Sequence, residues 1–328
     1  MARAEVQRVA PHAVVPGGRI TLSGHGFDVR PGVLPTVHVG GVAAHVVRAS
    51  PRQLVVEVPA TAPGGRQSLS VEGLEGATVY LDVATTVTTG VHQVDSPAYD
   101  RQGRLYATLS GQRGEQTPVA VFRIAHDGTR EPFVSNLGNA TSLAFGPDER
   151  LYVSSRFEGT VSRVTDGGDA ERFAESLGVA FGLAFDRDGR LYVGDRSGSI
   201  HRVTPDGHAT VFATVPSSVA AFHLAMSPDD TLVVAAPTLN SADALYRITP
   251  DGTTSRWLDG FGRPQGLAFD PHGTLHVVDA LASDSGVYRI EADGSRTLVV
   301  SGAGLLGVAF DPTDGALTVC TAEAIYRI

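Results

Sequence analysis

The stretch GLAFDRDGRLYVG, residues 182–194, is the most informative part of the sequence because close variants of it recur along the chain. Two short apolar runs flank a tight turn rich in Asp and Gly, which is the pattern of a β-hairpin. The six copies align on a Leu in the second run: Leu105, Leu151, Leu191, Leu232, Leu275 and Leu317. These residues lie 40 to 46 positions apart, which is the period of a β-propeller blade. Six copies predict six blades.

A second pattern follows each copy and carries an Arg in register. It reads VSRVTDGG at 161–168 and LYRITPDG at 245–252, and a further short strand follows it. Each repeat therefore supplies four strands, and we predict an all-β chain with a six-bladed propeller over residues 84–328. We expect the repeated arginines to act as stacking or ion-pair partners between blades, with ligand contact as the alternative. They are Arg123, Arg163, Arg202, Arg247, Arg289 and Arg327.

The sixth repeat ends at its third strand, because Ile328 is the last residue. Residues 84–90, ATTVTTG, precede the first repeat where an outer strand is missing. We predict that this segment completes the last blade and closes the ring, since pairing both ends removes an exposed sheet edge.

Residues 1–83 read differently, as short alternating strands separated by Gly and Pro, which is typical of a small β-sandwich. This region resembles the IPT/TIG immunoglobulin-like domain. The resemblance rests on the Pro-Gly-Gly step, the apolar strand after it and a G-x-G-F ending: Pro16, Gly17, Gly18, Ile20, Leu22, Gly24, Gly26 and Phe27. It implies an immunoglobulin-like sandwich that serves as a spacer or interaction module.

Composition excludes several function classes. The 328 residues carry a formal net charge of −9, and all 26 basic residues are Arg. Without Lys, Schiff-base chemistry and a phosphate-binding P-loop are excluded. The acidic balance and the lack of a basic run argue against a nucleic-acid partner. No apolar run has the length of a signal peptide or membrane span, so we expect a cytoplasmic chain with no membrane partner.

Two apparent motifs carry no chemistry in this context. The stretch GAGLLG at 302–307 matches the dinucleotide fingerprint, but it lies between two predicted strands with no helix to hold a pyrophosphate, so we expect no nucleotide cofactor. The single cysteine, Cys320, lies in the apolar strand LTVC, and we expect a small buried side chain there.

The two faces of the predicted ring differ in their connections. The turns within each hairpin are short and rich in Asp-Gly, and we assign no function to that face. The other connections are longer and vary between blades, which is where binding and catalysis usually lie. The polar residues on this second face, which we call the loop face, include Asp95, Arg113, Glu115, Asn139, Arg156, Glu158, Asp195, Arg196, His223, Asn240, Asp243, Arg263, Gln265 and Asp279.

The pattern G-L-A-F-D-x-x-G-x-L-Y-V resembles the SMP-30/gluconolactonase-like and NHL-type six-bladed propellers over the repeat region. That resemblance implies a divalent cation in the central channel, which polarises a substrate carbonyl and activates water. Its acidic ligand corresponds to Asp95, before Ser96-Pro97. Its auxiliary Asn corresponds to Asn139, and its later Asp-Gly corresponds to Gln265-Gly266, so the charge is lost there. Its Asn-Gly at a later inner strand falls near Phe181-Gly182 or Phe222-His223, where no Asn is present.

The resulting metal candidates are Asp95, Asn139, His223 and Gln265. Oxygen ligands suit Ca²⁺ or Mg²⁺, whereas His223, with His92 as a second imidazole, suits Zn²⁺. A hydrogen-bonded histidine that lines the channel is the alternative for His223.

Four loop-face arginines, Arg113, Arg156, Arg196 and Arg263, and the amide of Asn240 are candidate substrate-binding groups. A guanidinium binds carboxylate or phosphate bidentately, so these residues indicate an anionic group on the substrate. The alternative is pairing with the neighbouring Glu115, Glu158 and Asp195.

Three functions follow from these candidates. The first is a metal-dependent hydrolase of a small lactone or ester, with Asp279 or Asp195 as general base. The second is a non-catalytic propeller that uses the loop face to bind a protein or glycan partner. The third is a metal-dependent lyase that uses His92 and His223.

Overall fold

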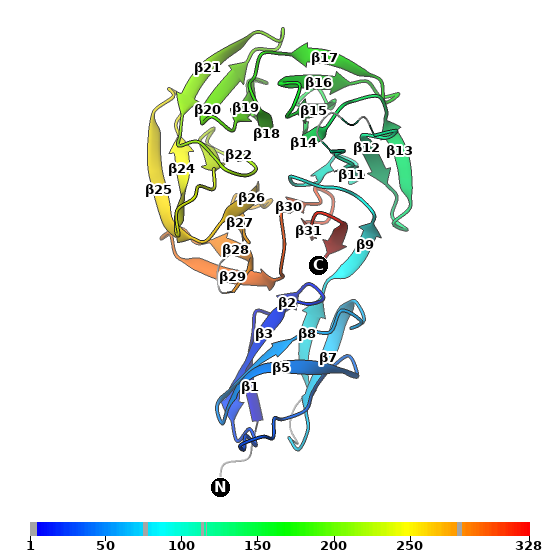
Figure 1. Cartoon of the computed structure of the whole chain (residues 1–328), viewed down its shortest axis with the longest axis vertical. Helices are drawn as coiled ribbons and strands as arrows, with labels where there is room; N and C mark the ends of the chain where they lie inside the picture. Colours follow the sequence, from blue (N-terminus) through cyan, green and yellow to red (C-terminus); the bar gives the residue numbers. More distant parts are fainter. Residues whose placement is uncertain (1–4, 75–77, 113–114, 116, 281–283) are drawn as a thin grey trace.

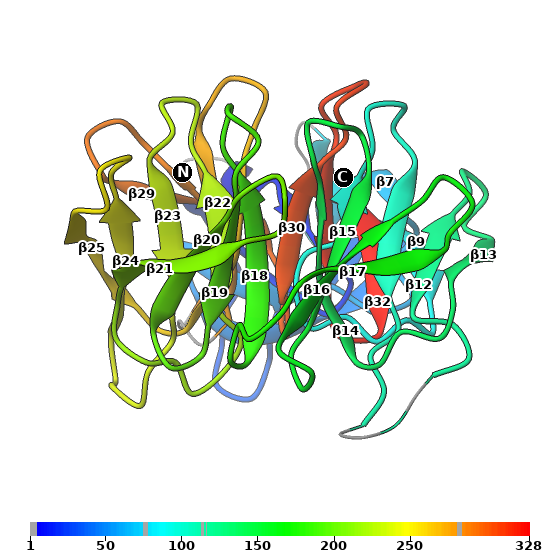
Figure 2. The ribbon, with the colours of Figure 1, turned by 90° about the horizontal axis from the view of Figure 1, so that it is seen from above.

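The chain folds as an all-β protein in the computed structural model, which describes residues 5–74, 78–112, 115, 117–280 and 284–328. Figure 1 shows a ring of small sheets around a central axis, with the N-terminal strands below it. Figure 2 shows the ring edge-on, with the strand connections on its two opposite faces. No helix within the described ranges is long and apolar enough to cross a membrane. The β-propeller arrangement predicted from the repeats is confirmed.

Four repeats form separate antiparallel sheets in sequence order, as expected. The first holds β10 (Ala98–Tyr99), β11 (Leu105–Thr108), β12 (Val121–Ile124) and β13 (Arg130–Val134). The second holds β14 (Ala140–Phe145), β15 (Leu151–Ser155), β16 (Thr160–Val164) and β17 (Ala170–Ala174). The third holds β18 (Ala180–Phe185), β19 (Leu191–Asp195), β20 (Ser199–Val203) and β21 (Ala209–Thr214). The fourth holds β22 (His223–Met226), β23 (Leu232–Ala235), β24 (Asp243–Ile248) and β25 (Thr254–Phe261).

The last sheet is completed by a strand from the start of the repeat region, as the sequence predicted. A fifth separate sheet has the order β30-β31-β32-β9, made of β30 (Gly307–Phe310), β31 (Leu317–Cys320), β32 (Ala324–Arg327) and β9 (Thr85–Thr89). Ile325 pairs with Thr88 and Arg327 with Thr85, so the outer strand comes from the start of the repeat region. The expectation that residues 84–90 complete the last sheet is confirmed.

The count of six separate blades is wrong, because hydrogen bonding separates only five four-stranded sheets. The strands of the remaining repeat are β26 (Pro264–Phe269), β27 (Leu275–Asp279), β28 (Gly286–Ile290) and β29 (Arg296–Ser301). They keep the antiparallel order of the others but belong to a twelve-stranded sheet. The cause is β2 (Ala13–Val14), which pairs in parallel with β29 on one side and with β8 (Val79–Val83) on the other.

The N-terminal strands supply the rest of this twelve-stranded sheet: β1 (Glu5–Ala10), β3 (Arg19–His25), β4 (Val37–Val39), β5 (Val42–Ser50), β6 (Gln53–Glu57) and β7 (Gly65–Val71). The pairing does not divide them into the two separate sheets of the expected sandwich. The physical reason is β5, which pairs with β4 through Val42–Ala44 and with β6 through His45–Ser50. Their apolar side chains nevertheless form one core, which includes Ile20, Leu22 and Leu54.

The junction between the N-terminal strands and the ring is a backbone contact. The Val15 N–H donates to the carbonyl of Ser301 at 2.8 Å, and the Arg19 N–H donates to the Ser301 hydroxyl at 3.0 Å. A Cβ on Gly18 would lie 2.6 Å from the Ser301 carbonyl oxygen, closer than Cβ atoms come to such an oxygen in real proteins. Gly18 is therefore needed for the close approach of the two backbones.

Four of the six repeated arginines, Arg123, Arg163, Arg202 and Arg247, stack on an aromatic ring of their own blade and not between blades. The guanidinium carbon of Arg247 lies 3.2 Å from the ring centre of Trp257, and that of Arg202 lies 4.9 Å from that of Phe212. Each pair joins the third strand of a sheet to its fourth strand. The expected stacking role is confirmed, but the expected position between blades is wrong.

Candidate functional site

The inner strands bring four polar side chains together at the ring centre. Asp95, just before β10, contacts His223 of β22, with 2.6 Å between Asp95 Oδ1 and His223 Nδ1. The other ring nitrogen of His223, Nε2, lies 3.0 Å from Gln265 Oε1 of β26. Ser142 of β14 donates its hydroxyl to Asp95 Oδ2, and the Ser96 N–H donates to Oδ1 at 2.6 Å. We call Asp95, Ser142, His223 and Gln265 the axial network. All four are buried.

The axial network favours the charged forms of Asp95 and His223. Burial alone raises the pKa of Asp95, but the His223 charge and the hydrogen bonds from His223, Ser142 and Ser96 outweigh it, so the pKa lies below its usual value of 3.8. Burial alone lowers the pKa of His223, but the Asp95 charge and hydrogen bond outweigh it, so the pKa lies above 6.5. Oxygen atoms face both ring nitrogens, which suits an imidazolium with two N–H donors.

The arrangement does not form a nucleophilic triad. Ser142 bonds to the carboxylate and not to the imidazole, so His223 is not placed to take the hydroxyl proton. Cys320 of β31 is also an unsuitable nucleophile, because it is fully buried and burial raises the pKa of its thiol. Its Sγ instead lies 3.6 Å from the Asp95 carbonyl oxygen.

Three of the four predicted metal ligands, Asp95, His223 and Gln265, are hydrogen-bonded to one another. Both nitrogens of His223 are engaged, and among the described residues no group of three or more His, Cys, Asp or Glu side chains is placed to hold a metal ion. Asn139 turns its amide away, donating to the carbonyls of Gly111 and Gln112 at 2.9 Å each. His92 contacts the Ser110 carbonyl through Nδ1. A cation does not fit this hydrogen-bonded arrangement, and metal binding stays a prediction.

Asp195 and Asp279, the candidate general bases, hold loop backbone. Asp195 Oδ1 accepts the N–H of Val179 at 2.8 Å, and Asp279 accepts those of Gly262 and Arg263 at 2.9 and 2.7 Å. In each case the carboxylate lies at the end of the second strand of a blade and binds the loop that leads into the first strand of the same blade. Their role in proton transfer is untested, and these contacts give both a structural task.

Arg156 and Arg196 form a cationic pair on the loop face. They follow β15 and β19, the second strands of neighbouring blades, and the Nε of each is buried without a hydrogen-bond partner. Burial, and secondarily the Arg196 charge, lowers the pKa of Arg156. No ion pair within the described ranges joins either one to Glu158, Asp195 or Glu115; Arg196 Nη2 donates instead to the Val219 carbonyl at 3.1 Å. The alternative of neighbouring ion pairs is not what the described residues show.

The other substrate-binding candidates are scattered. Arg263 also has a buried Nε without a partner. Asn240 is exposed in the connection from β23 to β24, where its N–H donates to the Thr238 hydroxyl at 3.1 Å. Arg113 lies outside the described residues.

Sequence reasoning missed Ser142, although a signal was present. Ser142 is the first residue of SLAF, the position that His223 occupies in HLAM and that Gly182, Gly266 and Gly307 occupy elsewhere. A comparison of this one register position would have placed Ser142 beside His223, because equivalent positions of inner strands meet at the axis.

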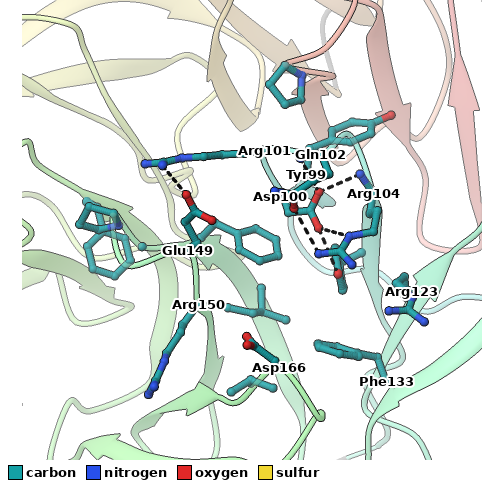
Figure 3. Close-up of a pocket in the computed structure, with 18 of the residues that line it drawn as sticks. Tyr99, Asp100, Arg101, Gln102, Arg104, Arg123, Phe133, Glu149, Arg150 and Asp166 are labelled. Atoms are coloured by element: carbon teal, nitrogen blue, oxygen red, sulfur yellow. Dashed lines mark hydrogen bonds and ion pairs between the residues drawn. The ribbon is translucent and has the colours of Figure 1, made fainter.

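The face with the short hairpin turns, to which we assigned no function, carries a cavity of about 740 Å³. Most of its lining comes from the first two blades, with Phe185 and Asp186 from the third and Pro312 from the last sheet, and Figure 3 shows its polar lining. Arg101 from the β10–β11 turn meets Glu149 from the β14–β15 turn across it, at 2.5 Å. We call this cavity the turn-face groove. The cavity forms where side chains of different blades pack against one another. A turn motif within one repeat therefore does not predict it.

Two protein-family models match parts of the chain. The model of the IPT/TIG domain matches residues 4–85, and that of the strictosidine synthase-like N-terminal region matches residues 182–203. The second match spans β18 to β20, on the repeat that opened the sequence reading. A search of curated proteins found no match.

Solved structures share the fold at low sequence identity. An auxiliary nutrient binding protein from Bacteroides ovatus is 14% identical, with a TM-score of 0.56, over 99% of this chain and 98% of its own. A gluconolactonase from Xanthomonas campestris is 19% identical, with a TM-score of 0.61, over 74% of this chain and 88% of its own. A virginiamycin B lyase from Staphylococcus aureus is 16% identical, with a TM-score of 0.51, over 70% of this chain and 77% of its own. These similarities establish a propeller fold.

Proposed function

We propose that the chain is a binding protein whose loop face recognises a small organic anion, and that Arg156 and Arg196 hold its charged group. The observation that carries this proposal is the pair of buried, unpartnered Nε atoms on neighbouring blades. A buried donor without a partner costs roughly 1–3 kcal/mol, so a ligand oxygen that accepts from it gains that much relative to the free protein. A guanidinium also offers the donor geometry that carboxylate and phosphate need.

The surroundings of the arginine pair favour a ligand with an apolar part. The Arg156 guanidinium lies 4.8 Å from the ring centre of Phe157, which is 42% exposed. Val219, whose carbonyl accepts from Arg196, is 39% exposed. Apolar side chains beside two cations match an aromatic or aliphatic carboxylate better than a bare inorganic ion.

Isothermal titration calorimetry with benzoate tests this proposal, with inorganic phosphate as the anion that lacks an apolar part. We expect benzoate to bind more tightly than phosphate, and R156Q and R196Q each to weaken benzoate binding about tenfold, from the loss of a charge-assisted hydrogen bond. R172Q is the matched control, because Arg172 lies on the outer strand β17 and, within the described part of the chain, its side chain pairs with Glu175 alone. Equal affinity in R156Q, R196Q and R172Q would overturn the proposal.

A second candidate function is hydrolysis of a small lactone or ester, as in the SMP-30/gluconolactonase-like propellers. Its support is the position of Asp95 and His223 at the ring axis and the similarity to the gluconolactonase. This function needs Asp95 and His223 to exchange their mutual hydrogen bond for a cation.

Metal analysis of the purified chain after incubation with Ca²⁺ or Zn²⁺ and dialysis, together with a lactone assay, tests the second candidate. One equivalent of metal that is lost in D95N, together with lactone turnover, would support hydrolysis. Neither metal nor turnover would leave the binding function. The lyase alternative has less support, because His92 contacts a backbone carbonyl and not the axial network.

The architecture that this function uses is a six-bladed ring. In this proposal, β26–β29 act as the remaining blade, and the strands of residues 1–83 form an immunoglobulin-like sandwich attached to its outer strand. The order β26-β27-β28-β29 and the match of the IPT/TIG model support this arrangement.

A further inference from the structure

We propose a second ligand site in the turn-face groove, and we infer that it takes a neutral saccharide. This inference is independent of the anion proposed for the loop face, because it concerns the opposite face of the ring. The groove measures about 740 Å³, within the roughly 300–1,000 Å³ range of small-molecule sites.

The charge of the lining argues for a neutral ligand. Four arginines line the groove, and so do the four carboxylates Asp100, Glu149, Asp166 and Asp186. The opposing charges cancel, so an anionic ligand would meet carboxylates and a cationic ligand would meet guanidiniums at similar distances, each at a cost. A sugar hydroxyl is both donor and acceptor, and it can therefore bond to both kinds of side chain at once.

The carboxylates with free bonding capacity come from the second blade. Asp100 is already used by its own turn, where it accepts from Gln102, Arg104 and Tyr106. Asp166, in contrast, has no partner among the described residues. Glu149 uses only Oε1, toward Arg101. In Figure 3, Asp166 of the second blade lies across from Arg123 and Phe133 of the first, whereas the Arg150 side chain runs away from them. Arg123 uses its Nε and Nη2 toward Glu131.

Aromatic side chains give the groove an apolar wall that suits the C–H face of a sugar ring. Phe133, Phe145 and Phe185 line it, and Tyr106 lies edge-on between Phe133 and Phe145, with ring centres 5.1 Å apart in each pair. The rings come from three blades, and the Tyr106 contacts hold two of them in place. A ligand that combines an apolar face with a rim of hydroxyls matches a groove with an aromatic wall and a polar mouth.

Calorimetric titration of the full chain with neutral sugars tests the inference: glucose, galactose, mannose, and the disaccharides maltose and cellobiose. We expect at least one of these sugars to bind, with an affinity that changes less than twofold between 50 mM and 500 mM NaCl, because no net charge is paired. E149Q and D166N are expected to weaken that binding at least fivefold each. Both side chains are exposed, so neither change threatens folding.

The matched control is D206N. Asp206 is an exposed carboxylate in the corresponding turn of the third blade, outside the groove. Sugar binding that is equally strong in E149Q, D166N and D206N would overturn the placement of the site. Failure of every sugar to bind would overturn the ligand class, and tighter binding of benzoate or of a cation in this groove would do the same. R156Q should leave sugar binding unchanged, which separates this inference from the loop-face proposal.

Discussion

Asp95 and His223 decide what the ring centre can do, and each explains the state of the other. Burial without a partner would raise the pKa of Asp95 and lower that of His223, so that each group would become neutral. The opposite is found: the pKa of Asp95 is lowered and that of His223 is raised. Mutual pairing keeps both charged, and Ser142, Ser96 and Gln265 satisfy the remaining atoms. The sequence singled out three of the four members of this axial network through the inner-strand positions. It could not show that they bond to one another, because their geometry depends on strands up to 170 residues apart.

The H223Q variant tests the charged state of this pair. The contribution of His223 is fully present below its unfolded pKa near 6.5 and is lost as the pH rises through the higher folded value. The contribution of Asp95 is present above about 3.8 and is lost as the pH falls through the lower folded value. Both contributions are fully present between about pH 3.8 and pH 6.5. We expect H223Q to reduce the free energy of unfolding by roughly 3–5 kcal/mol in that range, and by less at lower and at higher pH.

Urea unfolding of H223Q and of the unchanged chain between pH 3 and 9 measures this difference. A constant difference across that range would show that folding does not raise the pKa of His223, and would contradict the charged pair. The S142A variant, which removes only a hydroxyl donor from Asp95, is expected to cost about 1–2 kcal/mol and serves as the comparison.

At the scale of strands, local patterns predicted the regular blades, and long-range pairing accounts for what they missed. Alternation and Asp-Gly turns are local, so the hairpins of each repeat could be placed from the sequence. The two-residue strand β2 has no such signal. It exists because Ala13 and Val14 pair with Val300 and Ser301, nearly the whole chain length away. The same contact merges a blade with the N-terminal strands, which is why the count of separate sheets differs.

G18A tests the junction at β2. The added methyl group would overlap the Ser301 carbonyl oxygen, so the two backbones must separate. We expect a loss of about 1–3 kcal/mol in the free energy of unfolding. The control is G167A, where a Cβ would meet only ordinary contacts at 3.7 and 3.8 Å. Equal stability of G18A and G167A in urea unfolding would contradict the close approach.

T88P tests closure of the ring by β9. Thr88 pairs with Ile325, and Pro removes a backbone donor and fixes φ. We expect T88P to lower the melting temperature by several degrees, whereas T88V, which keeps the donor and suits a strand, leaves it within about 2 °C. Unchanged melting of T88P would show that the last blade does not depend on its outer strand.

The whole molecule presents two faces with different chemistry. The loop face offers Arg156 and Arg196 with unused donors, and the turn face offers a groove with balanced charge. The sequence indicated the arginines from their place in variable loops, but it gave no signal for the groove, since a space between blades depends on how side chains of two repeats pack. The axial network lies between these faces, and its side chains are hydrogen-bonded to one another. We therefore propose ligand binding on the faces in preference to catalysis at the ring centre.

An NMR titration of the arginine Nε–Hε resonances with benzoate observes anion recognition at the two side chains themselves. We expect the resonances of Arg156 and Arg196, assigned by their loss in R156Q and R196Q, to shift downfield as the ligand oxygens accept from them, while that of Arg172 stays in place. Unmoved Arg156 and Arg196 resonances at saturating benzoate would contradict anion recognition by the loop face.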